Sequence, residues 1–91
     1  MTMTDVTTMI RLNVRFFAAA GAAAGSETAV LELHSGATVD DALQKLCAHS
    51  QELALVLQKC SYLCDGIAVR DRATVLQAHQ TLDVLPPFAG G

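Results

Sequence analysis

The C-terminal residues are the part of the chain whose types and order suggest chemistry. The sequence ends in Pro86-Pro87-Phe88-Ala89-Gly90-Gly91. The prolines fix their own φ and keep Leu85 and Pro86 out of the helical region, so we expect the tail to leave the body in an extended direction. Glycine has no Cβ, so the last two residues form a chain narrow enough for a tunnel that excludes other residues. The stretch from Phe88 to Gly91 would reach about 13 Å.

Two interpretations of this ending are open from the residues alone. Chain ends are commonly frayed, and frayed ends favour glycine, so an unordered terminus is one interpretation. The other is a working tail that enters the pocket of a neighbouring protein and presents the free carboxylate of Gly91 there.

Length and composition limit the chain to one small domain. Its 91 residues allow one modest core and no second catalytic domain. The net charge is −3 with Lys and Arg scattered singly, so no basic surface is expected for nucleic acid. No apolar run approaches a membrane span, and residues 1–8 lack the features of a signal peptide. We therefore expect a cytoplasmic protein that binds neither nucleic acid nor membrane.

The cysteines and histidines do not form a recognisable metal or redox motif. Cys47, Cys60 and Cys64 are odd in number and irregularly spaced, which favours free, buried thiols over a disulfide framework. The spacing between the last two, with no histidine nearby, is not a usual zinc motif. No nucleophile, base and orienting group cluster in the sequence. We expect no metal site and no autonomous enzyme active site.

Alternation of apolar and polar residues predicts three strands, over 10–16, 28–33 and 81–85. Such alternation indicates one buried and one open face. Phe17 continues the polar side of the first strand, so we expect an exposed aromatic ring there.

Local signals predict a main helix and a hairpin. The sequence Thr38-Val39-Asp40-Asp41 is typical of a helix start, and apolar residues follow it at helical spacing. Asp65-Gly66 favours a two-residue turn between strands at 62–64 and 67–69. Short helical segments are expected at 18–24 and 53–57.

Together these elements predict an α+β fold in which a mixed sheet of four to five strands packs on one main α-helix. We expect a disordered leader over residues 1–8, a domain over 9–85 and a flexible tail over 86–91.

The order of elements and the ending together resemble the ubiquitin-like β-grasp sulfur carriers of the MoaD/ThiS superfamily. Within it, the ending Pro-Pro-x-x-Gly-Gly is most similar to that of the small subunits of molybdopterin synthase, the MoaD group. The resemblance covers the chain from about Ile10 onward and rests on these motifs: Val14–Ala20, Gly36–Val39, Asp65-Gly66 and Leu82–Gly91.

The resemblance implies a chemical route for the Gly91 carboxylate. An enzyme similar to MoeB adenylates it with ATP, and a sulfurtransferase converts it to a thiocarboxylate. A free α-carboxyl has a pKa of about 3.3–3.7, so it is ionised and unreactive until the adenylate gives it a leaving group. Gly90 and Gly91 then carry the sulfur into a MoaE-like large subunit, which holds cyclic pyranopterin monophosphate and the catalytic residues. The implied assembly has two small and two large subunits, and the small subunit binds no cofactor.

The resemblance also implies which residues contact partners. Phe17 and Leu85, on neighbouring strands, should form an apolar patch on the open face of the sheet. The residues after the last strand are expected to contact the partner as well: Pro86, Pro87, Phe88 and Ala89. Two other functions stay open. One is sulfur donation to another pathway, such as thiamin or cysteine biosynthesis, and the other is a ubiquitin-like protein modifier or interaction module.

Overall fold

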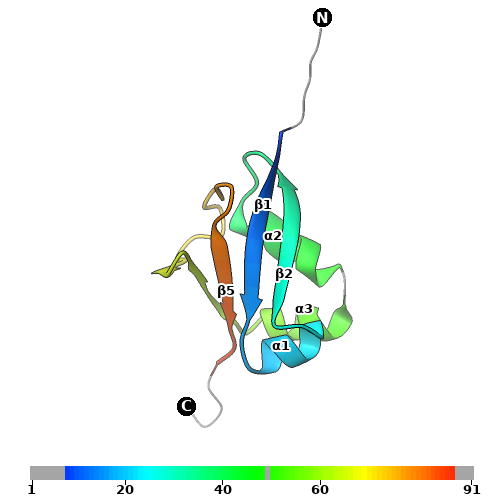
Figure 1. Cartoon of the computed structure of the whole chain (residues 1–91). Coiled ribbons are helices and arrows are strands. Elements are labelled where there is room, and N and C mark those ends of the chain that lie inside the picture. The colour runs from blue at the N-terminus through cyan, green and yellow to red at the C-terminus, as the bar shows by residue number, and fades with distance from the viewer. Residues whose placement is uncertain (1–7, 49, 88–91) are drawn as a thin grey trace, which may run out of the picture.

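The computed structural model describes residues 8–48 and 50–87, and in this part of the chain five strands form one sheet with three helices (Figure 1). The elements in order are β1 (Met9–Phe16), α1 (Ala19–Ala24), β2 (Thr28–His34), α2 (Val39–Cys47), α3 (Gln51–Leu57), β3 (Ser61–Cys64), β4 (Ile67–Ala68) and β5 (Thr81–Leu85). The strand order is β2-β1-β5-β3-β4. The predicted mixed sheet on a main helix is confirmed, and the two shorter helices accompany α2.

The first and last strands lie side by side in the middle of the sheet. β1 pairs antiparallel with β2 and parallel with β5, with Asn13 opposite Thr81 and Phe16 opposite Val84. β5 pairs antiparallel with β3 on its other side. Because β1 and β5 run in the same direction, their C-terminal ends meet at the same end of the sheet, beside α1 (Figure 1).

The core lies between one face of the sheet and the helices. Alternate residues of β1, namely Leu12, Val14 and Phe16, are buried there, as the period of a strand with one open face requires. β2, β5 and α2 supply the facing side chains: Leu31, Leu33, Leu82, Val84, Val39, Ala42, Leu43 and Leu46. The opposite face of the sheet carries the polar residues of the same strands.

The predicted start of α2 is a capping box. The Asp41 backbone N–H donates to the Thr38 hydroxyl at 3.2 Å, and the Thr38 backbone N–H donates to the Asp41 carboxylate at 2.9 Å. These bonds satisfy N–H groups that a helix start otherwise leaves unpaired. The bond from the Thr38 backbone to the carboxylate lowers the pKa of Asp41.

The predicted hairpin turn is also confirmed. Asp65 and Gly66 both have positive φ, 49° and 82°, as a primed two-residue turn requires. The Asp65 carboxylate accepts the backbone N–H of Thr81 at 2.8 Å, which fixes the turn to the start of β5. The second strand of the hairpin is shorter than expected, since β4 ends at Ala68.

One sequence expectation needs correction. Cys47, Cys60 and Cys64 are free thiols, as expected, but they are half-buried at the margin of the core instead of fully buried. Cys60 lies just before β3 and Cys64 at its end, and both pack against the core from its edge. Burial still raises the pKa of the Cys60 and Cys64 thiols, which keeps them protonated.

The predicted leader and tail lie mostly outside the described residues. Within residues 8–48 and 50–87, no helix is long and apolar enough to cross a membrane.

Candidate functional site

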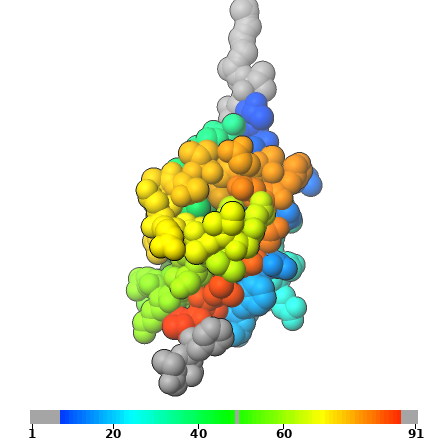
Figure 2. Space-filling model, turned by 90° about the vertical axis from the view of Figure 1, so that its left-hand side faces the viewer, coloured from blue at the N-terminus to red at the C-terminus, as the bar shows by residue number. Residues whose placement is uncertain are grey.

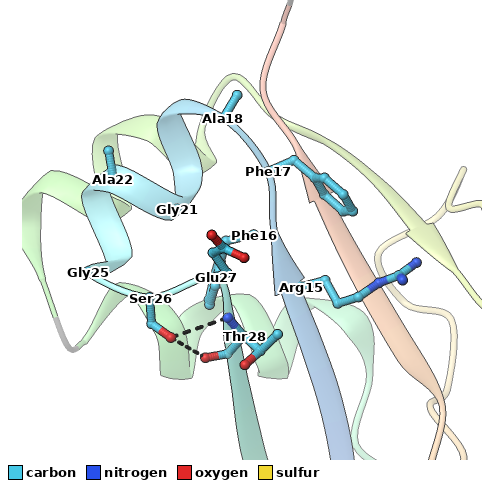
Figure 3. A pocket seen from close by; sticks show the side chains of 10 residues that line it. All are labelled: Arg15, Phe16, Phe17, Ala18, Gly21, Ala22, Gly25, Ser26, Glu27 and Thr28. Carbon is cyan, nitrogen blue, oxygen red and sulfur yellow. Dashed lines mark hydrogen bonds between the residues drawn. The ribbon is translucent and has the colours of Figure 1, made fainter.

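Phe17 and Leu85 meet on the open face of the sheet. The Phe17 backbone N–H donates to the Val84 carbonyl at 3.1 Å, so it continues the parallel pairing of β1 and β5 by one residue. This register places Phe17 beside Leu85, with both side chains on the face opposite the core. Figure 3 shows the Phe17 ring lying over β5. Phe17 is 40% exposed and Leu85 is half-buried. We call this pair the docking patch.

A partly buried ion pair borders the docking patch, two residues before Phe17 on β1 and two residues before Leu85 on β5. Arg15 lies opposite Asp83, and its Nε and Nη2 donate to Asp83 Oδ1 and Oδ2 at 2.6 and 2.9 Å. The guanidinium carbon also lies 5.6 Å from the centroid of the Phe17 ring, within range of a cation–π contact. The hydrogen bond to Asp83 and its negative charge raise the pKa of Arg15. Asp83 therefore fixes Arg15, which in turn steadies the Phe17 ring.

Sequence reasoning assigned no role to Arg15 or Asp83. Both stand at the polar positions of their strands, where a charged side chain is expected to face water. The signal was present only in the register: once β1 is known to pair in parallel with β5, these two charges fall opposite each other.

A groove continues from the docking patch toward α1. It has a volume of about 680 Å³ and lies between α1 and the ends of β1 and β2 (Figure 3). The Ser26 hydroxyl closes the turn on its far side by donating to the Thr28 carbonyl at 2.6 Å. Among the described residues, no three His, Cys, Asp or Glu side chains gather as a metal site would require. The groove therefore adjoins the docking patch on the surface of the described residues and holds no such cluster of metal-binding side chains.

The chain leaves the sheet beside this patch. β5 ends at Leu85, after which Pro86 is half-buried and Pro87 is exposed. Viewed from the side of the hairpin, the end of β5 reaches the surface between the green segment of α3 and the light-blue segment at the end of β1 (Figure 2). The predicted tail residues Phe88, Ala89, Gly90 and Gly91 lie outside the described residues, so their roles stay predictions.

The sequence model of the ThiS family matches residues 14–91. The chain belongs to the ThiS family. The matched range begins within β1 and runs to the Gly-Gly ending, so it includes the ion pair and the docking patch. The comparison with curated proteins gives no significant match.

Solved structures similar to this ThiS-family protein include some from archaea and bacteria. The solution structure of the HVO 2177 protein of Haloferax volcanii is 28% identical, with a TM-score of 0.83, 98% of this chain covered and 93% of that one. The crystal structure of SAMP1 from Haloferax volcanii is 27% identical, with a TM-score of 0.79 and coverage of 89% and 99%.

A third similar structure is a complex of subunits 1 and 2 of molybdopterin-converting factor from Helicobacter pylori. It is 20% identical, with a TM-score of 0.66 and coverage of 90% and 100%, so it shows the fold alone. Together with the family match, these structures confirm the β-grasp, ubiquitin-like fold of this ThiS-family protein.

Proposed function

We propose that this protein is a sulfur carrier that serves as the small subunit of molybdopterin synthase. One observation carries the proposal: the register of β1 and β5 joins an exposed apolar patch, Phe17 and Leu85, to the point where the chain leaves the sheet toward Gly91. A protein that docks through this patch holds the start of the tail at its own surface. In this proposal the folded domain binds the partner, and the C-terminal carboxylate of Gly91 is the group that reacts.

The reaction of the tail has three steps before delivery. An adenylating enzyme joins the Gly91 carboxylate to the adenylyl group of ATP and releases pyrophosphate. The outer sulfur of a persulfide on a sulfurtransferase then displaces AMP to give an acyl disulfide, and a thiol cleaves this disulfide, forming a new disulfide and leaving a thiocarboxylate at Gly91. Docking of the body keeps this group beside the acceptor at an effective concentration that free sulfide does not reach.

Support for a large-subunit partner comes from the fold and from one relative. The Helicobacter pylori structure of similar fold is a complex of two subunits of molybdopterin-converting factor. In the proposed assembly, a MoaE-like large subunit binds cyclic pyranopterin monophosphate and performs catalysis. This chain brings the sulfur and contributes no catalytic side chain.

A second candidate function has its own support. Two crystal structures of SAMP1, the small archaeal modifier protein 1 of Haloferax volcanii, are 25–27% identical to this chain over most of its length. A modifier uses the same adenylated glycine but transfers it to a lysine amine, with loss of AMP, so that the chain itself becomes attached. The two functions therefore differ in the acceptor of the Gly91 acyl group.

Intact-mass measurement of the full chain purified from its own cells separates these functions. A thiocarboxylate appears as a mass increase equal to the exchange of one oxygen for one sulfur, whereas a modifier appears linked to lysines of other proteins. Adding the charged chain to a MoaE-like large subunit and its precursor should yield the dithiolene product. The variant that lacks Gly91 should keep its fold and form no thiocarboxylate. Sulfur loading without dithiolene product would instead indicate another sulfur pathway, and absence of any Gly91 derivative would refute the proposal.

A further inference from the structure

The ion pair beside the docking patch differs from the other two ion pairs of the described residues. The Arg15 side chain is 55% exposed, while the side chain of its partner Asp83 is 8% exposed. The other two pairs expose both members, with 68% and 62% for Arg11 and Glu32 and 54% and 44% for Arg72 and Asp40.

This difference in exposure determines which charge of the pair a binding protein contacts. The negative charge of Asp83 lies beneath the surface, and the positive charge of Arg15 lies above it. Glu27 does not offset Arg15, because the two side chains point to opposite sides of β1 (Figure 3). The surface is therefore locally positive even though the pair as a whole is neutral.

The Arg15 guanidinium also has N–H donors that Asp83 does not use. Arginine carries five N–H groups in a planar fork, and Asp83 takes one from Nε and one from Nη2. Three N–H groups remain, including both on Nη1, and no acceptor for them is found among residues 8–48 and 50–87. This outer edge has the shape that a second carboxylate fits in a bidentate manner.

The position of Arg15 links these donors to the docking patch. Its guanidinium lies over the Phe17 ring, so a protein that covers the ring covers the guanidinium too. Burying unpaired N–H groups of a charged side chain is costly unless the partner supplies an acceptor. A partner that packs on the docking patch therefore needs a carboxylate side chain positioned against the free N–H groups of Arg15.

We propose that Arg15 is a specificity-determining residue that recognises an acidic side chain on the ATP-dependent adenylating enzyme. The partner places an apolar surface on Phe17 and Leu85, and an Asp or Glu carboxylate against the outer edge of the guanidinium. The inference rests on the proposed function, whose first step is adenylation, a step that the modifier function shares.

The test replaces the whole pair by leucine, Arg15→Leu with Asp83→Leu. Asp83 is the buried member of the pair, and exchanging a buried charge together with its partner for apolar side chains is often neutral or stabilising, so the fold should persist. The assay is ATP–pyrophosphate exchange by the MoeB-like enzyme of the same organism, which depends on the carrier. We expect an increase of roughly tenfold or more in the KM for the carrier, equal to about 1.4 kcal/mol. The wild-type KM should rise with ionic strength, and that of the variant should not.

The matched control is Arg11→Leu with Glu32→Leu, the same exchange at an exposed pair on the same face of the sheet. It should leave the KM and its salt dependence close to those of the wild type. If the leucine pair at 15 and 83 does not fold, Arg15→Lys decides: it keeps the charge but loses the planar fork, and it should raise the KM.

The outcomes separate this inference from the function on which it rests. The inference is overturned if the Arg15→Leu, Asp83→Leu variant has the KM of the wild type, or if Arg15→Lys does when the leucine variant does not fold. That result would not contradict the proposed function as a sulfur carrier. An equal rise in the control also overturns it, because the effect would then belong to the charge of the whole face. No exchange with the wild-type chain would overturn both.

Discussion

Phe16 and Phe17 are adjacent in sequence but face opposite sides of the sheet, which makes them a matched pair for testing the docking patch. Phe16 is 5% exposed within the core, and Phe17 is 40% exposed. We expect Phe16→Ala to lower the free energy of unfolding by about 3–5 kcal/mol, because the removed ring leaves a cavity. That is a large share of the roughly 5–15 kcal/mol typical of a small domain.

The same substitution at Phe17 should affect docking more than stability. The ring loses its contact with Arg15, which at an exposed site is worth about 0.5–1 kcal/mol, so unfolding should become easier by about that amount. A partner that covers the exposed 40% of a ring of about 200 Å² removes about 80 Å² from water. At about 25 cal/mol per Å² this contributes about 2 kcal/mol. Phe17→Ala should therefore raise the KM for the carrier roughly 30-fold.

Two measurements decide between docking and packing roles for Phe17. Urea unfolding gives the stability of both alanine variants, and carrier-dependent ATP–pyrophosphate exchange gives the KM of the Phe17 variant. If Phe17→Ala is as destabilising as Phe16→Ala, the ring belongs to the core. If the KM of Phe17→Ala equals that of the wild type, the docking patch is not used in activation.

Three further predictions concern the fold. Thr38→Ala removes the cap of α2 and should cost about 1 kcal/mol, seen as a melting temperature lower by roughly 4–8 °C. The pKa of Asp41 is lowered in the folded protein, so its contribution is present above the usual Asp pKa of about 3.9 and is lost as the pH falls through the folded pKa. Urea midpoints measured from pH 5 downward should accordingly fall less steeply in Asp41→Asn than in the wild type; parallel curves would contradict this. Tyr62 donates its hydroxyl proton to the Leu57 carbonyl at 2.6 Å, and burial raises the pKa of Tyr62 to about 12. Because it is the single tyrosine and the chain has no tryptophan, ultraviolet absorbance should follow this ionisation directly. The native state keeps a proton that the unfolded state releases, so stability should fall as the pH rises from about 10 toward 12, and ionisation near 10 in the folded protein would refute the assignment.

Local signals in the sequence were sufficient for most of the fold. The alternation from Ile10 to Phe16 predicts β1 because this strand has one buried and one open face, and Asp65-Gly66 predicts the hairpin because the turn needs two positive φ angles. Likewise, the cap at Thr38 is formed within four residues. Each of these features depends on residues close together in the chain.

Features that join distant residues could not be predicted from local patterns. Arg15 and Asp83 are 68 positions apart, and their pairing depends on the parallel register of β1 and β5. The adjacency of Phe17 and Leu85 was expected only because the family resemblance supplied the strand order. The half-buried state of the three cysteines depends on how the helices and the sheet pack together, which the pattern of a single element does not reveal.

The composition of the open face suits a carrier that must leave each partner it meets. Interfaces that form and separate repeatedly tend to be small, whereas permanent ones are larger and more apolar. Here the docking patch consists of two apolar side chains, and the next pair along β1 and β5 on the same face, Arg15 and Asp83, is charged. An ion pair at this position limits the apolar area and makes binding depend on charge complementarity, which favours fast association and discrimination over tight retention. Replacing the pair by leucine would enlarge the apolar area, so if the ion pair served only to hold the fold, the leucine variant should bind its partner more tightly; recognition through Arg15 requires the opposite.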